Sequence, residues 1–326
     1  MRVLVTGGAG FIGSHFVDRL LEADEDVVVL DRLTYAGNPA NLPDGIEFHR
    51  GDIAVRDDVD ACGVFDAIVN FAAETHVDRS ILGPSEFVRT DVLGALVLVQ
   101  IAHERRVRLV QVSTDEVYGD VAPPASARET DPLRPSSPYS ASKAGGDLQV
   151  LAAVRTFGAN ACITRGSNTY GPRQYPEKLI PLFVTNALGG EPLPLYGDGR
   201  QVRDWLHVDD HCAAVQLVLH EGAPGEIYNA AAGEERENVE VAERIIELTG
   251  ADPSLLRRVD DRPGHDRRYS LDSSKLRGLG WEPRRVFDDA LAHTVAWYRD
   301  NRPWWEPLKS GEYRAYYEQQ YAQRLR

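Results

Sequence analysis

The sequence lacks several features that would place the protein in a membrane, a secretory route or a metal-binding class. It has no run approaching the roughly 20 consecutive apolar residues that a bilayer-spanning helix needs. Its opening, MRVLVTGG, passes directly into a strand-like segment, without the charged, apolar and cleavage regions of a signal peptide. Its three cysteines, Cys62, Cys162 and Cys212, are widely spaced and form no CxxC pair. We therefore expect a cytoplasmic protein with no disulfide framework, no metal site and no membrane partner.

Positive charge is also scarce. Lysine and arginine together number 36 against 50 aspartates and glutamates, which gives a formal net charge of -14. Nucleic-acid binding depends on clustered cations that displace counterions from phosphates, so the composition argues against a nucleic-acid partner. With 43% hydrophobic and 26% charged residues, the chain has the composition of an ordinary globular protein.

Short β-branched runs alternate with helix-length segments through the first half of the chain. Helices are predicted at residues 11–23, 87–104 and 139–157. This alternation predicts an α/β fold of the Rossmann type, in which a doubly wound parallel sheet is covered by helices. The predicted strands are residues 2–6, 26–31, 46–50, 67–71, 108–113 and 161–164.

The second half of the chain has a looser pattern. Pro- and Gly-rich stretches follow Asn168 and indicate a smaller substrate-binding lobe. Residues 209–220 and 226–231 are expected to return to the sheet, so the two lobes should interleave. We assign residues 1–168, with a returning segment near 205–232, to the Rossmann domain, and residues 169–326 mainly to the substrate-binding lobe.

Apolar side chains near the C-terminus and on two helices have separate expected uses. The aromatic tail, residues 297–321, is predicted to pack against the body of the protein. Exposed apolar positions on the helices predicted at 87–104 and 139–157 would suit the pairing of two subunits. We therefore expect a homodimer.

A glycine-rich segment follows the first predicted strand. In TGGAGFIGS, Gly7, Gly10 and Gly13 stand three residues apart where a helix begins. Glycine allows a tight turn and a close approach of the backbone to a pyrophosphate, and the helix N-terminus supplies partial positive charge. The order of strand, glycines and helix predicts a dinucleotide site.

Acidic and small residues at later strand ends extend this prediction. Asp31 should accept hydrogen bonds from the adenosine ribose and repel a 2′-phosphate, which favours NAD over NADP, although the neighbouring Arg32 weakens the preference. Asp52, with Ile53, follows the third strand and either lines the adenine pocket or belongs to a plain surface loop. The small residues of FAAE, residues 71–74, would let the cofactor lie close to the fourth strand.

A Tyr and a Lys stand four residues apart in YSASK. Tyr139 and Lys143 should share one face of a helix. A lysine ammonium beside a phenol, with the positive nicotinamide ring nearby, lowers the phenol pKa, so that the tyrosinate can take a hydroxyl proton during hydride transfer. The alternative is a solvated helix face, which the glycine segment upstream makes the weaker interpretation.

Two adjacent carboxylates follow the fifth predicted strand. In STDEVYG, Thr114 is placed to hydrogen-bond the hydroxyl that Tyr139 would deprotonate, and Asp115 and Glu116 come next. Beside a site of oxidation, a carboxyl pair indicates a second acid–base step. We therefore expect this pair to decide which function the chain has.

Nearly the whole chain resembles the extended short-chain dehydrogenase/reductase family, and within it the dTDP-glucose 4,6-dehydratases. The segments that carry the resemblance stand in the family's order and spacing: TGGAGFIGS, DRLTYAGNPANL, AAETHVDRS, STDEVYG, SPYSASKA, SNTYGPRQYPEKLIPL, VRDWLHVDDH and DRPGHDRRY. TGGAGFIGS and SPYSASKA identify only the superfamily, whereas TDE, PEKLIP and DRPGH are more specific to the dehydratases.

The resemblance implies a reaction with roles for four residues. Tyr139, assisted by Thr114, would deprotonate the C4 hydroxyl of the glucosyl unit during its oxidation by NAD+. Glu116 would remove the acidified C5 proton while a protonated Asp115 donates to the departing C6 hydroxyl. Return of the hydride to C6 leaves the cofactor oxidised, so tightly retained NAD is expected.

The resemblance also implies two sets of binding residues. The cofactor set adds Phe11, Ile12, Leu33, Thr34, Phe71, Ala72, Ala73, Thr75, Thr90 and Thr169 to the residues above. The substrate set is Thr75, Thr114, Asn168, Lys178, Leu179, Pro194, Leu195, Tyr196, Arg203, Asn238, Asp261, Arg262, Pro263, Gly264 and His265. Among these, Lys178, Arg203 and Asn238 have the chemistry to hold a diphosphate.

Two positions depart from the family pattern. Thr169 replaces an Asn in SNTYG, which would alter a cofactor contact. Asp91 replaces an Asn after Thr90, which would perturb a buried hydrogen bond. Neither change removes a residue of the expected chemistry.

Two other functions share part of this pattern. An NAD-dependent sugar-nucleotide 4-epimerase would need the glycines, Tyr139 and Lys143, but has no use for the pair Asp115 and Glu116. A non-catalytic nucleotide-binding protein would need neither the base nor the pair. The base of the nucleotide, thymidine or uridine, and the pathway that uses the product both stay open.

Overall fold

The structure is a computed structural model that describes residues 1–321. Its centre is a seven-stranded sheet in the order β10-β6-β5-β4-β1-β2-β3, and every neighbouring pair is parallel. The predicted doubly wound sheet is thus confirmed. Its strands are β1 (Arg2–Thr6), β2 (Asp26–Asp31), β3 (Glu47–Arg50), β4 (Ala67–Asn70), β5 (Arg108–Thr114), β6 (Ala161–Gly166) and β10 (Ile227–Ala230).

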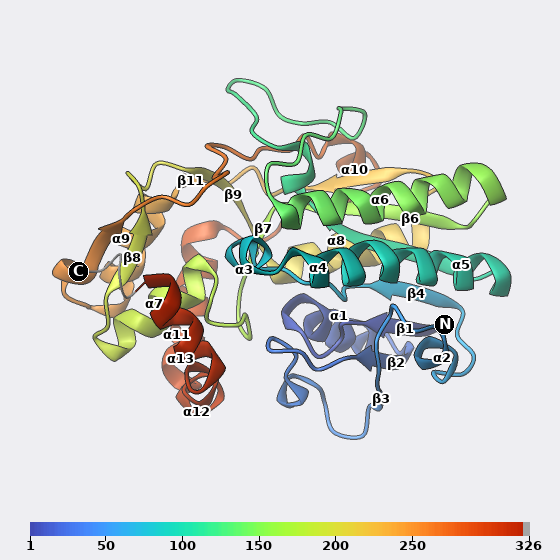
Figure 1. Cartoon of the computed structure of the whole chain (residues 1–326), viewed down its shortest axis with the longest axis horizontal. Helices are drawn as coiled ribbons and strands as arrows, with labels where there is room; N and C mark the ends of the chain where they lie inside the picture. The colour runs from blue at the N-terminus through green and yellow to red at the C-terminus, as the bar shows by residue number, and fades with distance from the viewer. Residues whose placement is uncertain (322–326) are drawn as a thin grey trace.

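Side chains of the strands alternate between two hydrophobic layers. On β1, Val3 and Val5 face the layer that contains helices α1 (Phe11–Glu22) and α8 (Val208–Glu221), whereas Leu4 faces the opposite layer. Helices α5 (Ala95–Arg105) and α6 (Pro138–Phe157) pack beside each other on that opposite face (Figure 1). The strand order reverses between β1 and β4, which is where such sheets bind ligands at their carboxyl ends.

The helix predicted at residues 87–104 is not one continuous α-helix. Helix α4 (Pro84–Phe87) leads into a π-helical segment (Val88–Gly94), and α5 follows. A side chain at Gly94 would place its Cβ 2.4 Å from Cδ1 of Ile53, so the helix packs too closely here for any larger residue. The extra residue per turn in the π-helical segment has no simple period in the sequence, which is why the pattern did not predict it.

The chain contributes to the central sheet again after the first elements of the second lobe. Helix α8 covers the face that carries α1, and β10 pairs with β6 at the end of the sheet. The chain therefore leaves the sheet after β6, builds much of a second lobe and comes back. The boundaries assigned to the two domains stay a prediction.

The second lobe is built from small sheets and helices around its own core (Figure 1). One sheet joins β11, β9 and β7, and β12 pairs in parallel with β8. The elements are β7 (Asn168–Tyr170), α7 (Leu179–Gly189), β8 (Leu193–Tyr196), β9 (Val202–His207), β11 (Glu235–Glu237), α9 (Asn238–Thr249), β12 (Leu256–Val259) and α11 (Phe287–Asp300). The other helices of the chain are α2 (Arg56–Asp60), α3 (Val77–Leu82), α10 (Ser274–Gly278), α12 (Arg302–Trp305) and α13 (Glu312–Tyr321).

The aromatic tail packs against this second core, as predicted. Trp305, Tyr313 and Tyr321 are buried within it, and Trp304 and Tyr317 contact it while partly exposed. The three cysteines are buried and unpaired. Within residues 1–321, no helix has both the length and the apolar character that crossing a bilayer demands.

Candidate active site

The turn between β1 and α1 brings three backbone segments into close contact. Gly7 has a φ of +69°, and a Cβ on it would lie 2.5 Å from the backbone nitrogen of Ala72 at the end of β4. A Cβ on Gly13 would lie 2.2 Å from the carbonyl oxygen of Gly7. Because Gly10 is the cap residue of α1, no side chain competes for the first amides of the helix. This backbone cradle fits the pyrophosphate of a dinucleotide.

Asp31 is fixed at the end of β2 by two backbone amides. Its Oδ1 accepts from the amide of Leu33 at 2.8 Å, and its Oδ2 accepts from the amide of Ala9 at 3.0 Å. Burial raises the pKa of Asp31, and these two hydrogen bonds oppose the rise. Leu33 therefore supports Asp31 through its backbone and does not line the cavity, contrary to its predicted role as a contact.

The neighbouring basic residue is already engaged by carboxylates. Arg32 lies 3.5 Å from Asp52 and 3.3 Å from Glu86. Asp52 also pairs with Arg89 and is nearly buried, so it does not belong to a plain surface loop. Burial opposes the ionisation of Asp52, but the hydrogen bonds from Arg89 and the Ala54 amide, together with the charges of Arg89 and Arg32, outweigh burial and lower the Asp52 pKa. The positive charge of Arg32 is thereby offset beside Asp31, which supports the preference for NAD.

One cavity of about 370 Å³ runs from the glycine turn into the second lobe. All five predicted catalytic residues line it, as do the predicted cofactor residues apart from Leu33. Among the predicted substrate residues, Asp261, Pro263 and Gly264 lie outside its lining. Asp261 instead supports the cavity wall, because its carboxylate is hydrogen-bonded to His265 Nδ1 at 2.6 Å and to Gln201 Nε2 at 2.9 Å.

Local structure explains how the base and its lysine enter the cavity. Helix α6 begins with a capping box in which Ser137 and Ser140 bond each other's backbone amides. Tyr139 therefore lies in the first turn, and Lys143 lies one turn later on the same face. The ammonium of Lys143 donates to the carbonyl oxygen of Val112 on β5 at 2.8 Å, which ties α6 to the strand that ends in Thr114.

Asp115 sits in a nearly closed environment. It is 3% exposed, its Oδ1 accepts from the Thr114 hydroxyl at 3.0 Å, and its Oδ2 has no partner within residues 1–321. Burial, reinforced by the charge of Glu116, raises the pKa of Asp115 to about 8. The carboxyl is therefore protonated at neutral pH, the state that a proton donor needs. Glu116 is more accessible, and it approaches the same cavity from the next position.

The phenol of Tyr139 departs from the sequence-based expectation. Burial, together with the charges of Glu116 and Asp91, raises its pKa well above the ordinary value, while a hydrogen bond from Thr114 partly opposes the rise. Lys143 alone does not offset burial, and its ammonium is directed at a backbone carbonyl. Within the chain itself the expected lowering of the Tyr139 pKa is not seen, and the positive nicotinamide ring of a bound cofactor would have to supply it.

The two departures from the family pattern both make specific contacts. Asp91 is buried in the π-helical segment, where it accepts from the Ser142 hydroxyl at 2.6 Å and the Glu74 amide at 3.3 Å. Burial raises its pKa to about 6. Thr169 bonds His211 Nδ1 at 2.7 Å. Burial lowers the pKa of His211 to about 4, so this ring is neutral.

The cationic end of the cavity lies in the second lobe. Lys178 donates to the backbone carbonyl of Thr75. Arg203 is buried on β9, donates to the Asp266 carbonyl at 3.0 Å and lies 4.1 Å from the ring centre of Tyr269. Arg262 lines the same region. Lys178, Arg203 and Arg262 all interact with the charge of Glu116, and three cations in one region suit a dianionic diphosphate.

Several cavity residues were missed by sequence reasoning. Glu177 is one example, because it holds Arg79 at 3.1 Å and the Tyr35 hydroxyl at 2.7 Å across 98 and 142 residues of chain. Contacts over such separations leave no periodic signal, although Glu177 stands inside the recognisable PEKLIP segment. The others missed include Asp78, Gln174, Trp205, His211, Tyr269 and Tyr321.

Comparisons with known proteins agree with this geometry. Residues 3–231 match the NAD dependent epimerase/dehydratase family. A dTDP-glucose 4,6-dehydratase of Streptomyces niveus is 53% identical over 324 residues, covering 95% of this chain and 96% of the relative.

Solved structures also include both dehydratases and epimerases that are similar to this chain. DesIV, a dTDP-glucose 4,6-dehydratase from Streptomyces venezuelae with NAD and TYD bound, is 54% identical with a TM-score of 0.92, covering 95% of this chain and all of DesIV. A UDP-glucose 4-epimerase of Thermus thermophilus in complex with NAD is 36% identical with a TM-score of 0.88, covering 92% of this chain and 100% of the epimerase. The chain is thus more similar to these dehydratases than to this epimerase.

Proposed function

The chain belongs to the NAD dependent epimerase/dehydratase family, and from that premise we propose that it converts dTDP-glucose to dTDP-4-keto-6-deoxyglucose with loss of water. One observation carries this proposal. Asp115, whose buried carboxyl has a pKa of about 8, stands beside the more accessible Glu116 at the cavity that Tyr139 also lines. A donor and an acceptor of protons are thereby paired next to the site of oxidation, an arrangement that a 4-epimerase does not require.

NAD is the cofactor that the residues fit. The glycine turn gives the backbone cradle, and Asp31 is held by two amides where the ribose hydroxyls would lie. When bound, NAD+ would supply a hydride acceptor for C4 of the glucosyl unit and, once reduced, a hydride donor for C6, so it would end each cycle oxidised. Because the cofactor would end the cycle in its starting oxidation state, we expect the protein to retain it between turnovers.

The protons can be followed from residue to residue. Tyr139 takes the C4 hydroxyl proton, Glu116 takes the C5 proton, and Asp115 gives its proton to the C6 hydroxyl, which leaves as water. Glu116 then returns its proton to C5. At this point Tyr139 holds one extra proton and Asp115 lacks one. The Thr114 hydroxyl bonds Asp115 at 3.0 Å and also interacts with Tyr139, so it lies on the path that restores both residues.

The thymidine nucleotide is part of the proposal. Relatives near 50% identity are named as dTDP-glucose dehydratases, and Pro194, Leu195 and Tyr196 line the end of the cavity at which the family pattern implies contacts with the nucleotide. Thymidine and uridine differ by one ring methyl. Parallel assays with dTDP-glucose and UDP-glucose therefore test this choice directly.

A homodimer and a cytoplasmic location complete the proposal. Val88 and Leu93 beside α5, and Leu148 and Phe157 on α6, are 43–62% exposed. Apolar side chains gathered on two adjacent helices favour the pairing of subunits through this face. Three unpaired cysteines suit a reducing compartment. Molar mass by light scattering for the native chain and for Leu148→Arg tests the dimer, since the variant should shift toward monomer.

The decisive experiment uses purified protein and dTDP-glucose without added cofactor. Loss of one water by mass spectrometry, with the absorbance of an alkali-treated 4-keto-6-deoxy sugar and no net NADH, is the expected result. A galacto product of unchanged mass would identify an epimerase instead. No product after addition of NAD+ and UDP-glucose would identify a binding protein.

A further inference from the structure

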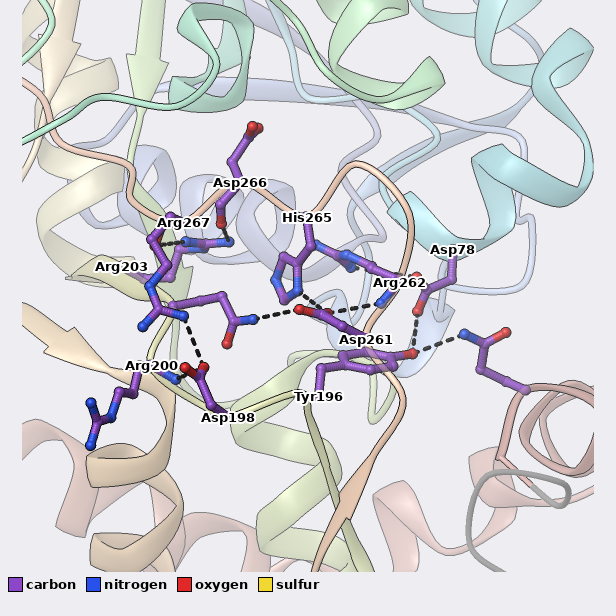
Figure 2. A network of polar contacts seen from close by, with 12 residues as sticks. Asp78, Tyr196, Asp198, Arg200, Arg203, Asp261, Arg262, His265, Asp266 and Arg267 are labelled. Atoms are coloured by element: carbon purple, nitrogen blue, oxygen red, sulfur yellow. Dashed lines mark hydrogen bonds and ion pairs between the residues drawn. The ribbon is translucent and has the colours of Figure 1, made fainter.

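Asp78 is a buried carboxylate whose side-chain hydrogen-bond and ion-pair partners, within residues 1–321, come from the opposite lobe. It is the second residue of α3, on the cofactor side of the cavity, and it is 4% exposed. Its Oδ2 accepts from the Tyr196 hydroxyl at 2.9 Å, and its Oδ1 lies 3.5 Å from Nη1 of Arg262. Figure 2 shows this carboxylate between the two side chains. The neighbouring Arg79 is engaged elsewhere, by Glu177.

The two partners of Asp78 lie on adjacent chain segments. Tyr196 ends β8, and Arg262 follows β12, which pairs with β8 so that Tyr196 stands opposite Val259. The guanidinium of Arg262 lies 5.9 Å from the ring centre of Tyr196. A single carboxylate thus joins α3 of the first lobe to both strands of the small sheet in the second.

Other contacts fix the rest of this network (Figure 2). Asp261 accepts from the backbone amide of Arg262 at 2.8 Å, which sets the start of the loop. From helix α13, Gln320 donates to the Tyr196 hydroxyl at 2.8 Å, and the Tyr321 hydroxyl lies 3.3 Å from it. The backbone of the loop and the ring of Tyr196 are therefore held by contacts that do not involve Asp78. Asp78 orients the Tyr196 hydroxyl and the Arg262 guanidinium.

Charge explains why a carboxylate is needed at this place. Burial opposes ionisation of Asp78, but Arg262, His76 and Tyr196 outweigh it and lower the Asp78 pKa. Arg262 shares the cavity with Lys178 and Arg203, whose charges repel it. Its Nε is buried and has no acceptor within residues 1–321. Asp78 therefore holds Arg262 among like charges, and the unpartnered Nε leaves Arg262 a donor for a ligand.

We propose that Asp78 is a positioning residue for substrate binding. From the cofactor side of the cavity, Asp78 orients Tyr196 and Arg262 toward the nucleoside diphosphate. This inference rests on the proposed function. Among the described residues, no hydrogen bond or ion pair joins Asp78 to the residues of the proposed proton path, so its removal should weaken nucleotide binding and leave the chemical step nearly intact. It also makes the fit of the second lobe against α3 a determinant of substrate affinity.

The test compares Asp78→Ala, Asp78→Asn and Tyr196→Phe with a matched control. Asp198→Asn is the control, because Asp198 also pairs with an arginine of this lobe, Arg267, but in solvent. For each protein we would measure kcat and KM for dTDP-glucose, the Kd of dTDP by calorimetry, retained NAD and thermal stability. Including dTDP separates binding from turnover.

Asp78→Ala should raise both KM and the dTDP Kd about 30-fold, with kcat changed less than about threefold and NAD retained. Asp78→Asn keeps an acceptor for Tyr196 but loses the ion pair, so a change of about tenfold is expected, while Tyr196→Phe should give about fivefold. In the double variant Asp78→Asn with Tyr196→Phe, the two effects should not add. The control should match the native chain.

The outcomes separate this inference from the proposed function. If the native chain neither dehydrates dTDP-glucose nor binds dTDP, the proposed function fails. If it does both and the folded Asp78 variants bind dTDP as tightly as the native chain, the positioning role is wrong. Loss of kcat at unchanged KM would also overturn it, because Asp78 would then act on the chemistry. If Asp78→Ala does not fold, the nearly isosteric Asp78→Asn decides.

Discussion

The two ends of the cavity are built in different ways. At the cofactor end, backbone contacts form the cradle, and the charged groups are paired: Asp31 with two amides and Asp52 with Arg89 and Arg32. At the substrate end, polar atoms are buried without partners within residues 1–321, including Oδ2 of Asp115, Oδ1 of Asn238 and Nε of Arg262. Paired charges and close backbone contacts fix the shape of the cofactor end, whereas the unpartnered groups of the substrate end are available to a ligand that enters and leaves in every turnover.

The largest effect is expected from Glu116→Gln, which should stop the step at the substrate end and spare oxidation by the cofactor. Glutamine cannot take the C5 proton, so product formation should fall about 1000-fold while partial C4 oxidation persists. Mass spectrometry of the sugar and NADH absorbance would separate the two steps. Glu104→Gln, at an exposed ion pair with Arg56, is the control. An unchanged product rate would remove Glu116 from its assigned role.

The cofactor end should be sensitive to a change in its backbone. Gly7 and Gly250 both have a φ of +69°, but a Cβ on Gly7 would lie within 3 Å of backbone atoms, whereas a Cβ on Gly250 would meet open space. Gly7→Ala should therefore lose bound NAD, and Gly250→Ala should cost only about 1 kcal/mol of stability and keep it. Cofactor content and thermal unfolding of the two variants would show the difference. Equal NAD retention would mean that the close approach at Gly7 is unimportant.

Two carboxylates, one from each end, should respond to pH with opposite signs. The pKa of Asp115 is raised to about 8, so its favourable contribution to folding is complete below about pH 4 and is lost as pH rises through about 8. Asp115→Asn should therefore stabilise the protein increasingly from about pH 4 to about pH 8, while lowering kcat about 100-fold.

Asp52→Asn should do the reverse. The Asp52 pKa is lowered, so its contribution is present above about pH 4 and is lost as pH falls. The variant should be less stable than the native chain at neutral pH and approach it in acid. Thermal unfolding across this pH range checks both variants, and shifts of the same sign would contradict the contrast between the two carboxylates.

The smallest expected effect lies between the two ends, at Asp91. Its carboxylate is mostly ionised at neutral pH, and it adds to the burial and the Glu116 charge that raise the Tyr139 pKa. Asp91→Asn should therefore move the acid limb of the kcat profile downward by less than about one pH unit. A shift to higher pH would show that lost contacts to Ser142 or Glu74 matter more than charge.

The difference between the cofactor end and the substrate end also explains which features could be predicted from the sequence. The sheet, α1, α6 and the glycine turn follow from local patterns, because residues 2–31 contain the strand, the turn, the helix and the acidic end that make the site. Tyr139 and Lys143 could be paired for the same reason, since they share one helix. The roles assigned to these residues in catalysis and binding stay predictions.

The substrate end could be predicted only through family resemblance. Asp78 meets Tyr196 and Arg262 across 118 and 184 residues, and no periodicity encodes such a contact. The interrupted helix before α5 was predicted as continuous because Gly94 and Ile53 meet only in the fold. The raised pKa of Tyr139 depends on how completely the folded chain buries it, which a motif does not state.

The position of β10 has a consequence for how this protein could be divided or produced. Strand β6 receives its outer partner only when residues 227–230 have been made and folded back. A fragment that ends near Asn168 would present β6 as an unpaired, apolar edge, the kind of surface that templates aggregation. A nucleotide-binding module cut from this chain would need α8 and β10 joined to it, so a linker that replaces the segment between β6 and α8 suits its isolation better than simple truncation.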